Sequence, residues 1–279
     1  MKAVISGASG YVGGAIAKAF RCADWSVCPP DLGSGKKWRM PADPDPGSFS
    51  GADAFVHAAW DMRPATARDA RRTNVEGSRN LLGSAIGCGV RRLVFISSMS
   101  AFDGCHSLYG RMKREVERDF LKAGGVVVRP GLVYGANPGG MIGKLLGPVR
   151  SLPLLPVPCP DAPQFLVHQE TLAGIVLRAG NGELASGVYS VAHPEPVTLR
   201  QIVRALAESV HSRPLIIPVP WRIAWLGLKL LGICGARIPF SSDNLVGLAK
   251  ANTRPDFSPL KNLGIDPPAF PRGPGGGLK

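Results

Sequence analysis

Four short apolar runs mark the first half of the chain, and each has the length of a buried strand. They are residues 3–6, 54–57, 93–96 and 126–128. Apolar residues recur at helical spacing between them, around residues 15–20, 74–86 and 110–122. The runs lack strict apolar–polar alternation, which is typical of strands covered on both faces of a parallel sheet. With right-handed crossovers, this order predicts an α/β fold with a doubly wound parallel sheet.

Beyond Gly135 the chain becomes rich in glycine and proline. Residues 151–160 hold so many prolines that no regular element is expected there. Thr198 should cap a helix ending near Val210, and the apolar residues 214–240 favour a helix buried in a second lobe. The alternative for that helix is to rest on a membrane surface or on a partner. We therefore predict two units. The core comprises residues 1–135, to which residues 164–195 return, and a small mixed C-terminal lobe comprises residues 136–163 and 196–279.

Composition narrows the possible functions. The 279 residues include 33 Lys and Arg against 20 Asp and Glu, a net charge of +13 that favours anionic partners. No apolar stretch reaches the ~20 residues of a membrane span, and the start of the chain does not resemble a signal peptide. The six cysteines form no C-x-x-C pair and the histidines show no zinc spacing. We expect a cytoplasmic protein with no metal site, no nucleic-acid partner and no membrane association.

A glycine-rich turn follows the first strand and opens the first helix. Glycine at three-residue spacing allows a tight turn, close approach of the backbone to a pyrophosphate and close packing of helix on strand. The free N–H groups at the helix start can then bind phosphate. We therefore predict a dinucleotide site at Gly7, Ser9, Gly10, Tyr11, Val12 and Gly13.

The choice between NAD and NADP depends on the residues that follow the second strand. Asp31 lies 24 positions after Gly7, where an acidic residue selects the ribose hydroxyls of NAD. Lys36, Lys37 and Arg39 follow closely and could instead neutralise a 2′-phosphate. The sequence weakly favours NAD.

Tyr109 and Lys113 are four residues apart in a helical stretch, so their side chains share one helix face. A lysine so placed should lower the pKa of the phenol. The strand at residues 93–96 ends in Ser97, Ser98 and Ser100. Such sheets bind ligands at this carboxyl edge, so a serine there could orient a substrate oxygen that exchanges a proton with the phenol.

These motifs, taken in order, resemble the extended short-chain dehydrogenase/reductase family, in its NAD-dependent epimerase/dehydratase group. The resemblance implies a Rossmann fold and covers nearly the whole chain. It rests on GASGYVG at 7–13, VHAA at 56–59, NVEG at 74–77, FISS at 95–98, YGRMK at 109–113 and RPGLVYG at 129–135.

The resemblance also implies roles for individual residues. Tyr109 would be the acid/base, and Lys113 would hold the nicotinamide ribose. Ser98 and Ser100 would contact substrate, with Ser98 the favoured catalytic serine and Ser100 the alternative. The other residues expected at the cofactor are Asp43 near the adenine, His57, Ala58 and Ala59 along it, Asn74 in a helix that stabilises the sheet, and Pro130 near the nicotinamide.

Two departures from the family pattern affect the expected reaction. Only ten residues separate Ser98 from Tyr109, fewer than is usual in this family. Met99 and Ser100 stand where sugar-nucleotide dehydratases have an Asp–Glu pair, which argues against dehydration.

The leading hypothesis is an NAD(P)-dependent epimerase or oxidoreductase acting on a nucleotide-activated sugar. Arg222, Arg237 and Arg254 are candidates for binding its phosphates. One alternative is a reductase of a small or apolar carbonyl compound, and another is an inactive dinucleotide-binding scaffold. The family's dimers suggest a homodimer through the helices that here include residues 74–86 and 110–122.

Overall fold

The computed structural model describes residues 1–33, 38–62, 64, 66–136, 139–233 and 240–271. Its centre is a six-stranded, wholly parallel sheet in the order β10-β5-β4-β3-β1-β2. The strands are β1 (Lys2–Ser6), β2 (Ser26–Cys28), β3 (Ala54–His57), β4 (Arg92–Ile96), β5 (Val126–Pro130) and β10 (Gly187–Val191). The predicted fold class is confirmed. Each predicted strand is present, and the order reverses at β1, between β2 and β3.

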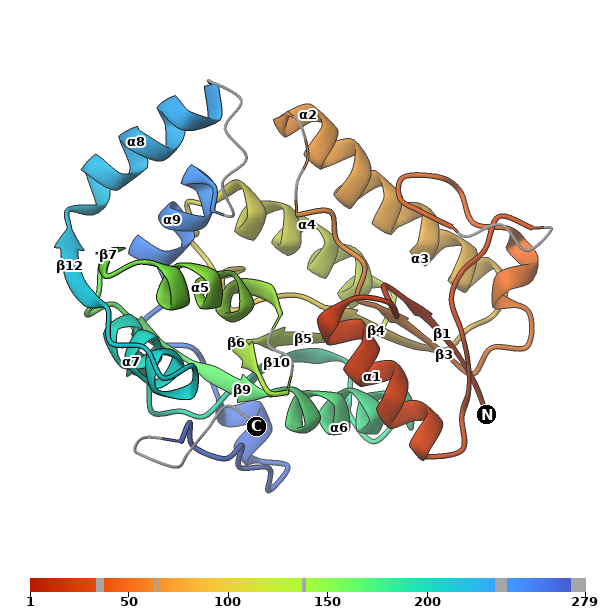
Figure 1. The fold of residues 1–279 in the computed structure, drawn as a ribbon. Helices are drawn as coiled ribbons and strands as arrows, with labels where there is room; N and C mark the ends of the chain where they lie inside the picture. Colours follow the sequence, from red (N-terminus) through yellow and green to blue (C-terminus); the bar gives the residue numbers. More distant parts are fainter. Residues whose placement is uncertain (34–37, 63, 65, 137–138, 234–239, 272–279) are drawn as a thin grey trace.

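Helices cover both faces of this sheet (Figure 1). One face packs against α1 (Tyr11–Cys22) and α6 (Gln169–Gly180), with Ile16 and Phe20 in the core between them. The opposite face buries Phe55, Phe95 and Phe120. It is covered by α2 (Ala67–Ala70), the π-helical turn η2 (Arg71–Glu76), α3 (Gly77–Gly87) and α4 (Leu108–Lys122). The predicted helix at 74–86 is thus one continuous helical segment that begins earlier.

The remaining elements build a smaller, mixed region with a hydrophobic cluster of its own, which includes Ile142, Val157 and Leu206. Its helices are α5 (Gly140–Ser151), α7 (Leu199–Ser209), α8 (Trp221–Ile233) and α9 (Ser242–Ala249). The short helix α10 (Ser258–Lys261) instead packs against β10 of the central sheet. Three two-stranded pairs accompany the helices of the smaller region: β6 (Leu132–Tyr134) with β9 (Leu166–His168), β7 (Leu154–Pro158) with β12 (Leu215–Val219), and β8 (Pro163–Gln164) with β11 (Val197–Thr198). A 3₁₀ turn, η1 (Pro46–Phe49), lies between β2 and β3.

Two predictions for this second half were wrong, and one is confirmed. Residues 151–160 include a strand, β7, because β12 pairs with it in parallel across about sixty residues of sequence. Prolines are tolerated in β7 because it lies at the edge of a two-stranded sheet. Residues 214–240 hold both β12 and α8 rather than one helix, and α8 is not buried. The predicted cap at Thr198 is confirmed, since Thr198 and Gln201 form a capping box at the start of α7.

Candidate active site

The turn between β1 and α1 leaves room for backbone atoms only. Gly7 has φ +74°, and a Cβ at Gly13 would lie 2.1 Å from the Gly7 carbonyl oxygen. Among the described residues no side chain caps α1, and its first turn holds no acidic residue. Its first N–H groups are therefore available to an anion. This glycine cradle at a helix N-terminus, beside the strand where the sheet order reverses, fits the pyrophosphate of a dinucleotide.

The loop after β3 lies directly beside this turn. A Cβ at Gly7 would be 2.7 Å from the backbone nitrogen of Ala59 and 2.9 Å from the carbonyl carbon of Ala58. Ala58 and Ala59 are both partly exposed. On the other side, Gly139 at the start of α5 contacts the ring of Tyr11, since a Cβ there would lie 2.6 Å from Tyr11 Cγ. The C-terminal region therefore meets the core at the glycine turn.

His57 does not present its side chain to this crevice. The imidazole is 0% exposed, and it lies among the rings of Phe55, Phe95 and Phe120. Hydrogen bonds join Nδ1 to Ser6 Oγ (2.6 Å) and Nε2 to Ser78 Oγ (2.7 Å). Burial lowers the pKa of His57 to about 3, so the ring is neutral. The residue can offer the crevice only its backbone, contrary to the expectation that it lines a cofactor.

Asn74 is also fully buried, and it supports the crevice from behind. Its Oδ1 accepts a hydrogen bond from the Asp61 N–H at 2.7 Å, and its Nδ2 donates to the Asp61 carbonyl at 3.0 Å. This pair of bonds fixes the backbone that follows Ala59. That Asn74 belongs to the cofactor site stays a prediction.

The acidic candidates for ribose and adenine recognition lie in the loop after β2. Asp31 follows the end of β2 and is partly exposed, and its Oδ1 accepts from the Gly33 N–H at 2.9 Å. Asp43 is exposed and accepts a hydrogen bond from Asn80. Arg39 is exposed, whereas Lys36 and Lys37 fall outside the described residues. Asp31 is in the place expected for recognition of ribose hydroxyls.

The structure brings Tyr109 and Ser98 together beyond the carboxyl end of β4. The Ser98 side chain lies near the Tyr109 phenol and lowers its pKa, against the larger effect of burial. Ser100 instead donates its backbone N–H to Ser98 Oγ at 3.1 Å. Of the two serines, Ser98 is therefore the one beside the phenol, and Ser100 helps to hold it. Burial raises the pKa of Tyr109 to about 12.

Lys113 lies one helical turn from Tyr109 but is directed at the strand end. Its side chain is buried, and Nζ donates to the Ile96 carbonyl at 2.7 Å. Nζ also lies 3.9 Å from the centre of the Trp60 ring, and 5.9 Å from that of Tyr109. Burial lowers the pKa of Lys113 to about 7. The prediction that Lys113 makes the phenol more acidic is therefore wrong for this geometry, because a half-neutral amine facing Ile96 exerts little pull on the phenol.

Glu117 was not singled out from the sequence, although its spacing was a usable signal. It follows Lys113 by four residues, as Lys113 follows Tyr109, so all three share one face of α4. The buried carboxylate accepts two hydrogen bonds from Arg129, at 2.7 and 2.6 Å, and one from Ser97 at 2.5 Å. Its charge raises the pKa of Lys113, against the larger effect of burial. Glu117 thus ties the catalytic helix to β5, just before Pro130.

The start of α4 is held by two distant contacts that the sequence did not predict. The Asp243 carboxylate, from α9, accepts hydrogen bonds from the backbone N–H groups of Leu108 (2.8 Å) and Tyr109 (3.1 Å). Gly110 packs so closely on the loop after β4 that a Cβ there would lie 2.2 Å from the Ser100 carbonyl oxygen. The short segment between Ser98 and Tyr109 therefore folds tightly against the helix.

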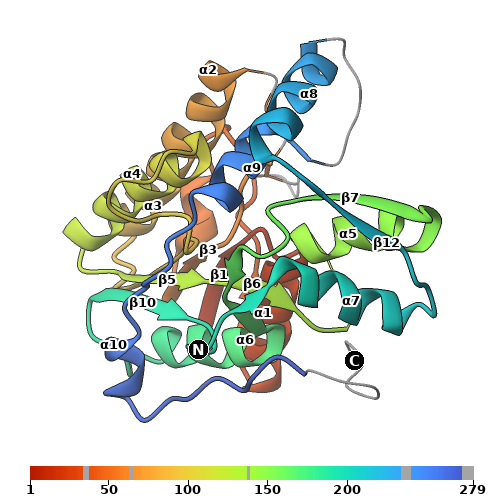
Figure 2. The same cartoon turned by 90° about the vertical axis from the view of Figure 1, so that its left-hand side faces the viewer.

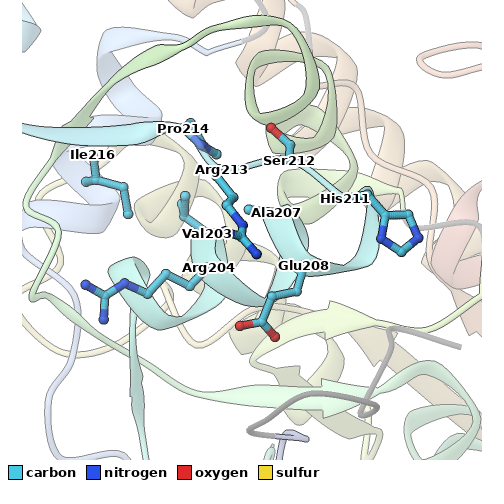
Figure 3. A pocket seen from close by; sticks show the side chains of 9 residues that line it. All are labelled: Val203, Arg204, Ala207, Glu208, His211, Ser212, Arg213, Pro214 and Ile216. Carbon is cyan, nitrogen blue, oxygen red and sulfur yellow. The ribbon is translucent and has the colours of Figure 1, made fainter.

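The arginines predicted to bind phosphate are exposed where the structure describes them. Arg222 lies exposed on α8 and Arg254 is exposed, while Arg237 falls outside the described residues. A separate hollow of 520 Å³ lies between α7 and β12, lined by polar residues such as Arg204, Glu208 and Arg213 (Figure 3). None of the predicted site residues lines it. In the described part of the chain no cluster of His, Cys, Asp or Glu could hold a metal.

Comparisons with known proteins point in the same direction as the motifs. Residues 48–108 match the model of the 3-beta hydroxysteroid dehydrogenase/isomerase family. The chain is 27% identical over 263 residues to a 3beta-hydroxysteroid-dehydrogenase/decarboxylase of Arabidopsis thaliana, covering 78% of this chain and 60% of that protein. It is 28% identical over 174 residues to the ceramide reductase of Caulobacter vibrioides, covering 61% of this chain and 54% of that protein. A UDP-glucose 4-epimerase of Vibrio cholerae is 26% identical over 222 residues (71% and 65%).

The fold is shared with solved structures of low sequence identity. One is MoeE5 in complex with UDP-glucose and NAD, with a TM-score of 0.67, 19% identity and coverage of 79% of this chain and 85% of that one. Another is RMD from Pseudomonas aeruginosa complexed with NADPH, with a TM-score of 0.64, 17% identity and coverage of 88% and 97%. The chain therefore shares the fold of these structures, and over part of its length it is similar to the 3-beta hydroxysteroid dehydrogenase/isomerase family and to the relatives named above.

Proposed function

We propose that this protein is an NAD(P)-dependent oxidoreductase that interconverts a secondary alcohol and a ketone, with Tyr109 as the acid/base. The observation that carries the proposal is the Tyr109 phenol with the Ser98 side chain beside it at the carboxyl edge of the sheet, in a fold whose glycine cradle fits a dinucleotide. The nicotinamide supplies the hydride donor or acceptor when it is bound.

The cofactor would be held by the elements that meet at the sheet reversal. The N–H groups of the Gly7–Gly13 turn and the start of α1 would bind the pyrophosphate. Ala58 and Ala59 would offer backbone and small side chains beside Gly7. Asp31 would accept hydrogen bonds from a ribose, which favours NAD, and Asp43 and Pro130 keep their proposed places near the adenine and the nicotinamide.

Each residue of the Tyr109 group has a distinct part in the proposed proton transfer. In the reductive direction the Tyr109 phenol donates its proton to the carbonyl oxygen, and in the oxidative direction the phenolate accepts the hydroxyl proton. Ser98 donates a hydrogen bond to the same oxygen and orients it. Lys113 would hold the nicotinamide ribose, and Glu117 acts on Lys113 by favouring its ammonium form.

We further propose that the substrate is apolar around its reacting carbon. The Tyr109 ring packs edge-on against Trp60. The short segment between Ser98 and Tyr109 contains two partly exposed apolar residues, Met99 and Phe102. Arg222 and Arg254, the described arginines expected at a diphosphate, are both exposed, and within the described residues neither side chain has a hydrogen bond or ion pair that would fix it toward a phosphate. The relatives named for a sterol and for ceramide agree with this choice. A nucleotide sugar remains the second candidate because of the UDP-glucose 4-epimerase relative.

The two substrate classes are separated by measuring nicotinamide absorbance with a 3β-hydroxysteroid, a long-chain aliphatic ketone and UDP-glucose, each with NAD(H) and NADP(H). We expect turnover of an apolar compound, lost in Tyr109→Phe and kept in Tyr189→Phe, whose hydroxyl bonds the Ala185 carbonyl away from the site. Conversion of UDP-glucose alone would support the sugar assignment. Tight cofactor binding with no turnover of any compound would favour the scaffold alternative.

Three expectations about context stay predictions. They are the division into a core and a substrate lobe, a cytoplasmic location and a homodimer through α3 and α4. In the described structure those two helices carry ion pairs between themselves, from Arg79 to Glu115 and Asp119. Within the same residues, no helix combines the length and the apolar character needed to cross a bilayer.

A further inference from the structure

Helix α8 exposes a row of large apolar side chains. Ile223, Leu226 and Leu230 are 64%, 53% and 54% exposed. Their spacing of three and four residues places them on one face of the helix. The sequence predicted a buried helix here, whereas these three side chains are exposed in the structure. Soluble monomers rarely display such a contiguous apolar face without a use for it.

Two cations border this face, and each lies near a tryptophan. Arg222 and Lys229 are both exposed. The Arg222 guanidinium is 5.8 Å from the centre of the Trp221 ring, and Lys229 Nζ is 4.7 Å from that of Trp225. The described part of α8 has no acidic residue in its first turn. An apolar face with basic residues and tryptophan beside it is typical of helices that lie in the plane of a membrane surface.

More apolar surface adjoins the start of α8. Leu215 and Ile217 of β12 are exposed, and in the parallel register Leu215 pairs with Leu154 of β7, which is exposed too. β12 leads into α8 through Pro220 alone. In Figure 2 both elements lie on the side of the molecule that faces the viewer. Six exposed large apolar residues of the described chain therefore lie on α8, β12 and the paired strand β7, while others such as Met62 and Ile86 lie on other elements.

We propose that α8, with its apolar residues Ile223, Leu226 and Leu230, docks this protein on the surface of an anionic membrane. Apolar residues would enter the boundary between headgroups and acyl chains, while Arg222 and Lys229 would meet anionic headgroups. The net charge of +13 adds a general attraction to such a surface. With thirteen residues, α8 lies on the bilayer and does not cross it.

The basic residues argue against a second copy as the occupant. A twofold interface places the same patch on both subunits. Such an interface would bring Arg222 and Lys229 of both copies into one patch, and the described part of the helix offers no carboxylate in its first turn to offset them. An anionic lipid surface complements both features of the face at once.

Docking there would lie close to the proposed active site. α8 packs against α9, and α9 carries Asp243, which caps the helix of Tyr109. If the proposed apolar substrate is correct, the membrane is also where such a substrate dissolves. Docking itself does not depend on that assignment, because it is measured without turnover.

The test is flotation of the full chain with vesicles of phosphatidylcholine alone or mixed with phosphatidylglycerol. The variants are the triple Ile223→Ser, Leu226→Ser, Leu230→Ser, and the double Arg222→Gln, Lys229→Gln. Ile86→Ser on α3 is the matched control, since Ile86 is similarly exposed at 49%. Circular dichroism and cofactor binding check that each variant is folded.

We expect the wild type and Ile86→Ser to float with the anionic vesicles, and the triple variant to bind about tenfold or more weakly. The double variant should bind several-fold more weakly and lose most of its salt dependence. The proposal is overturned if the wild type does not float, or if the triple variant floats as well as the wild type. Conversion of a wild-type dimer to a monomer by the triple variant, without vesicle binding, would assign the face to a second copy instead.

Discussion

Asp243 caps the helix that carries Tyr109, although 134 residues separate the two in sequence. The Asp243 carboxylate accepts the backbone N–H of Tyr109 at 3.1 Å, and that of Leu108 at 2.8 Å. A carboxylate at a helix N-terminus stabilises the helix through both the hydrogen bonds and the helix dipole. The C-terminal region therefore helps to fix the position of the proposed acid/base.

Asp243→Ala should destabilise the protein by about 1 kcal/mol, the usual cost of a lost cap. It should also lower kcat more than it changes KM because, of the described side chains, only that of Ser107, which accepts from the Gly110 N–H, would then hold the start of α4. Asp243→Asn keeps an acceptor and should recover most of both properties. Urea unfolding and steady-state kinetics check this. Equal kcat in all three proteins would show that the cap is only structural.

Lys113→Met should inactivate the protein and yet stabilise it near neutral pH. The pKa of Lys113 is about 7 in the folded protein, against 10.5 for the free side chain. Between these values the unfolded chain binds a proton that the folded one does not, so stability rises with pH from about 7 to 10.5. Removing the amine should add on the order of 1–3 kcal/mol at pH 7 and flatten this rise.

The measurement for Lys113→Met is urea unfolding at pH 7 and pH 9, beside turnover. Lys122→Met serves as the control, since Lys122 is exposed on the same helix. Lys122→Met should change neither the pH dependence of the free energy of unfolding nor turnover. A destabilised Lys113→Met protein with an unchanged pH slope would contradict the buried-amine description.

Gly13→Ala should abolish dinucleotide binding. The added methyl group would lie 2.1 Å from the Gly7 carbonyl oxygen, so the turn must open. Gly83→Ala on α3 is a matched control, because nothing lies within 4 Å of a Cβ there. That change should leave binding intact and stabilise the helix by about 0.5–1 kcal/mol. Titration of NADH fluorescence measures the cofactor affinity of both variants. An unaltered affinity in Gly13→Ala would contradict the assignment of the glycine turn as the pyrophosphate site.

Acid should destabilise the protein through His57. Its pKa is about 3 in the fold, against 6.5 for the free side chain. The unfolded chain therefore takes up a proton below pH 6.5 that the folded protein excludes, and stability falls by about 1.4 kcal/mol per pH unit toward pH 3. His57→Gln should remove most of this slope, whereas His106→Gln, at an exposed position, should not. Chemical unfolding from pH 7 to pH 4.5 distinguishes them.

Local patterns predicted the parts of this structure that depend on nearby residues. The four apolar runs became strands because each is buried on both faces, and the glycine turn follows from three positions within seven residues. The spacing of Tyr109 and Lys113 placed both on one helix face for the same reason. Glu117 could have been found by extending that spacing once more.

The features that the sequence did not predict depend on distant partners or on burial. β7 is a strand because β12 pairs with it, and Asp243 caps α4 only once α9 has folded beside it. The direction of the Lys113 side chain is set by the Ile96 carbonyl and Trp60. The four-residue spacing alone therefore did not predict how Lys113 affects the pKa of Tyr109. The side chain of His57 was expected at the cofactor, but tertiary packing encloses it.

The central claim is that Tyr109 exchanges a proton with a substrate oxygen while hydride moves to or from a nicotinamide. The most direct test is a single turnover of a ketone with a cofactor deuterated at the nicotinamide C4, followed by mass spectrometry of the alcohol. The account predicts deuterium on the carbinol carbon with the wild type, and a rate lower by about 10²–10⁴ in Tyr109→Phe with cofactor affinity unchanged. Deuterium transfer at the wild-type rate in Tyr109→Phe would contradict it.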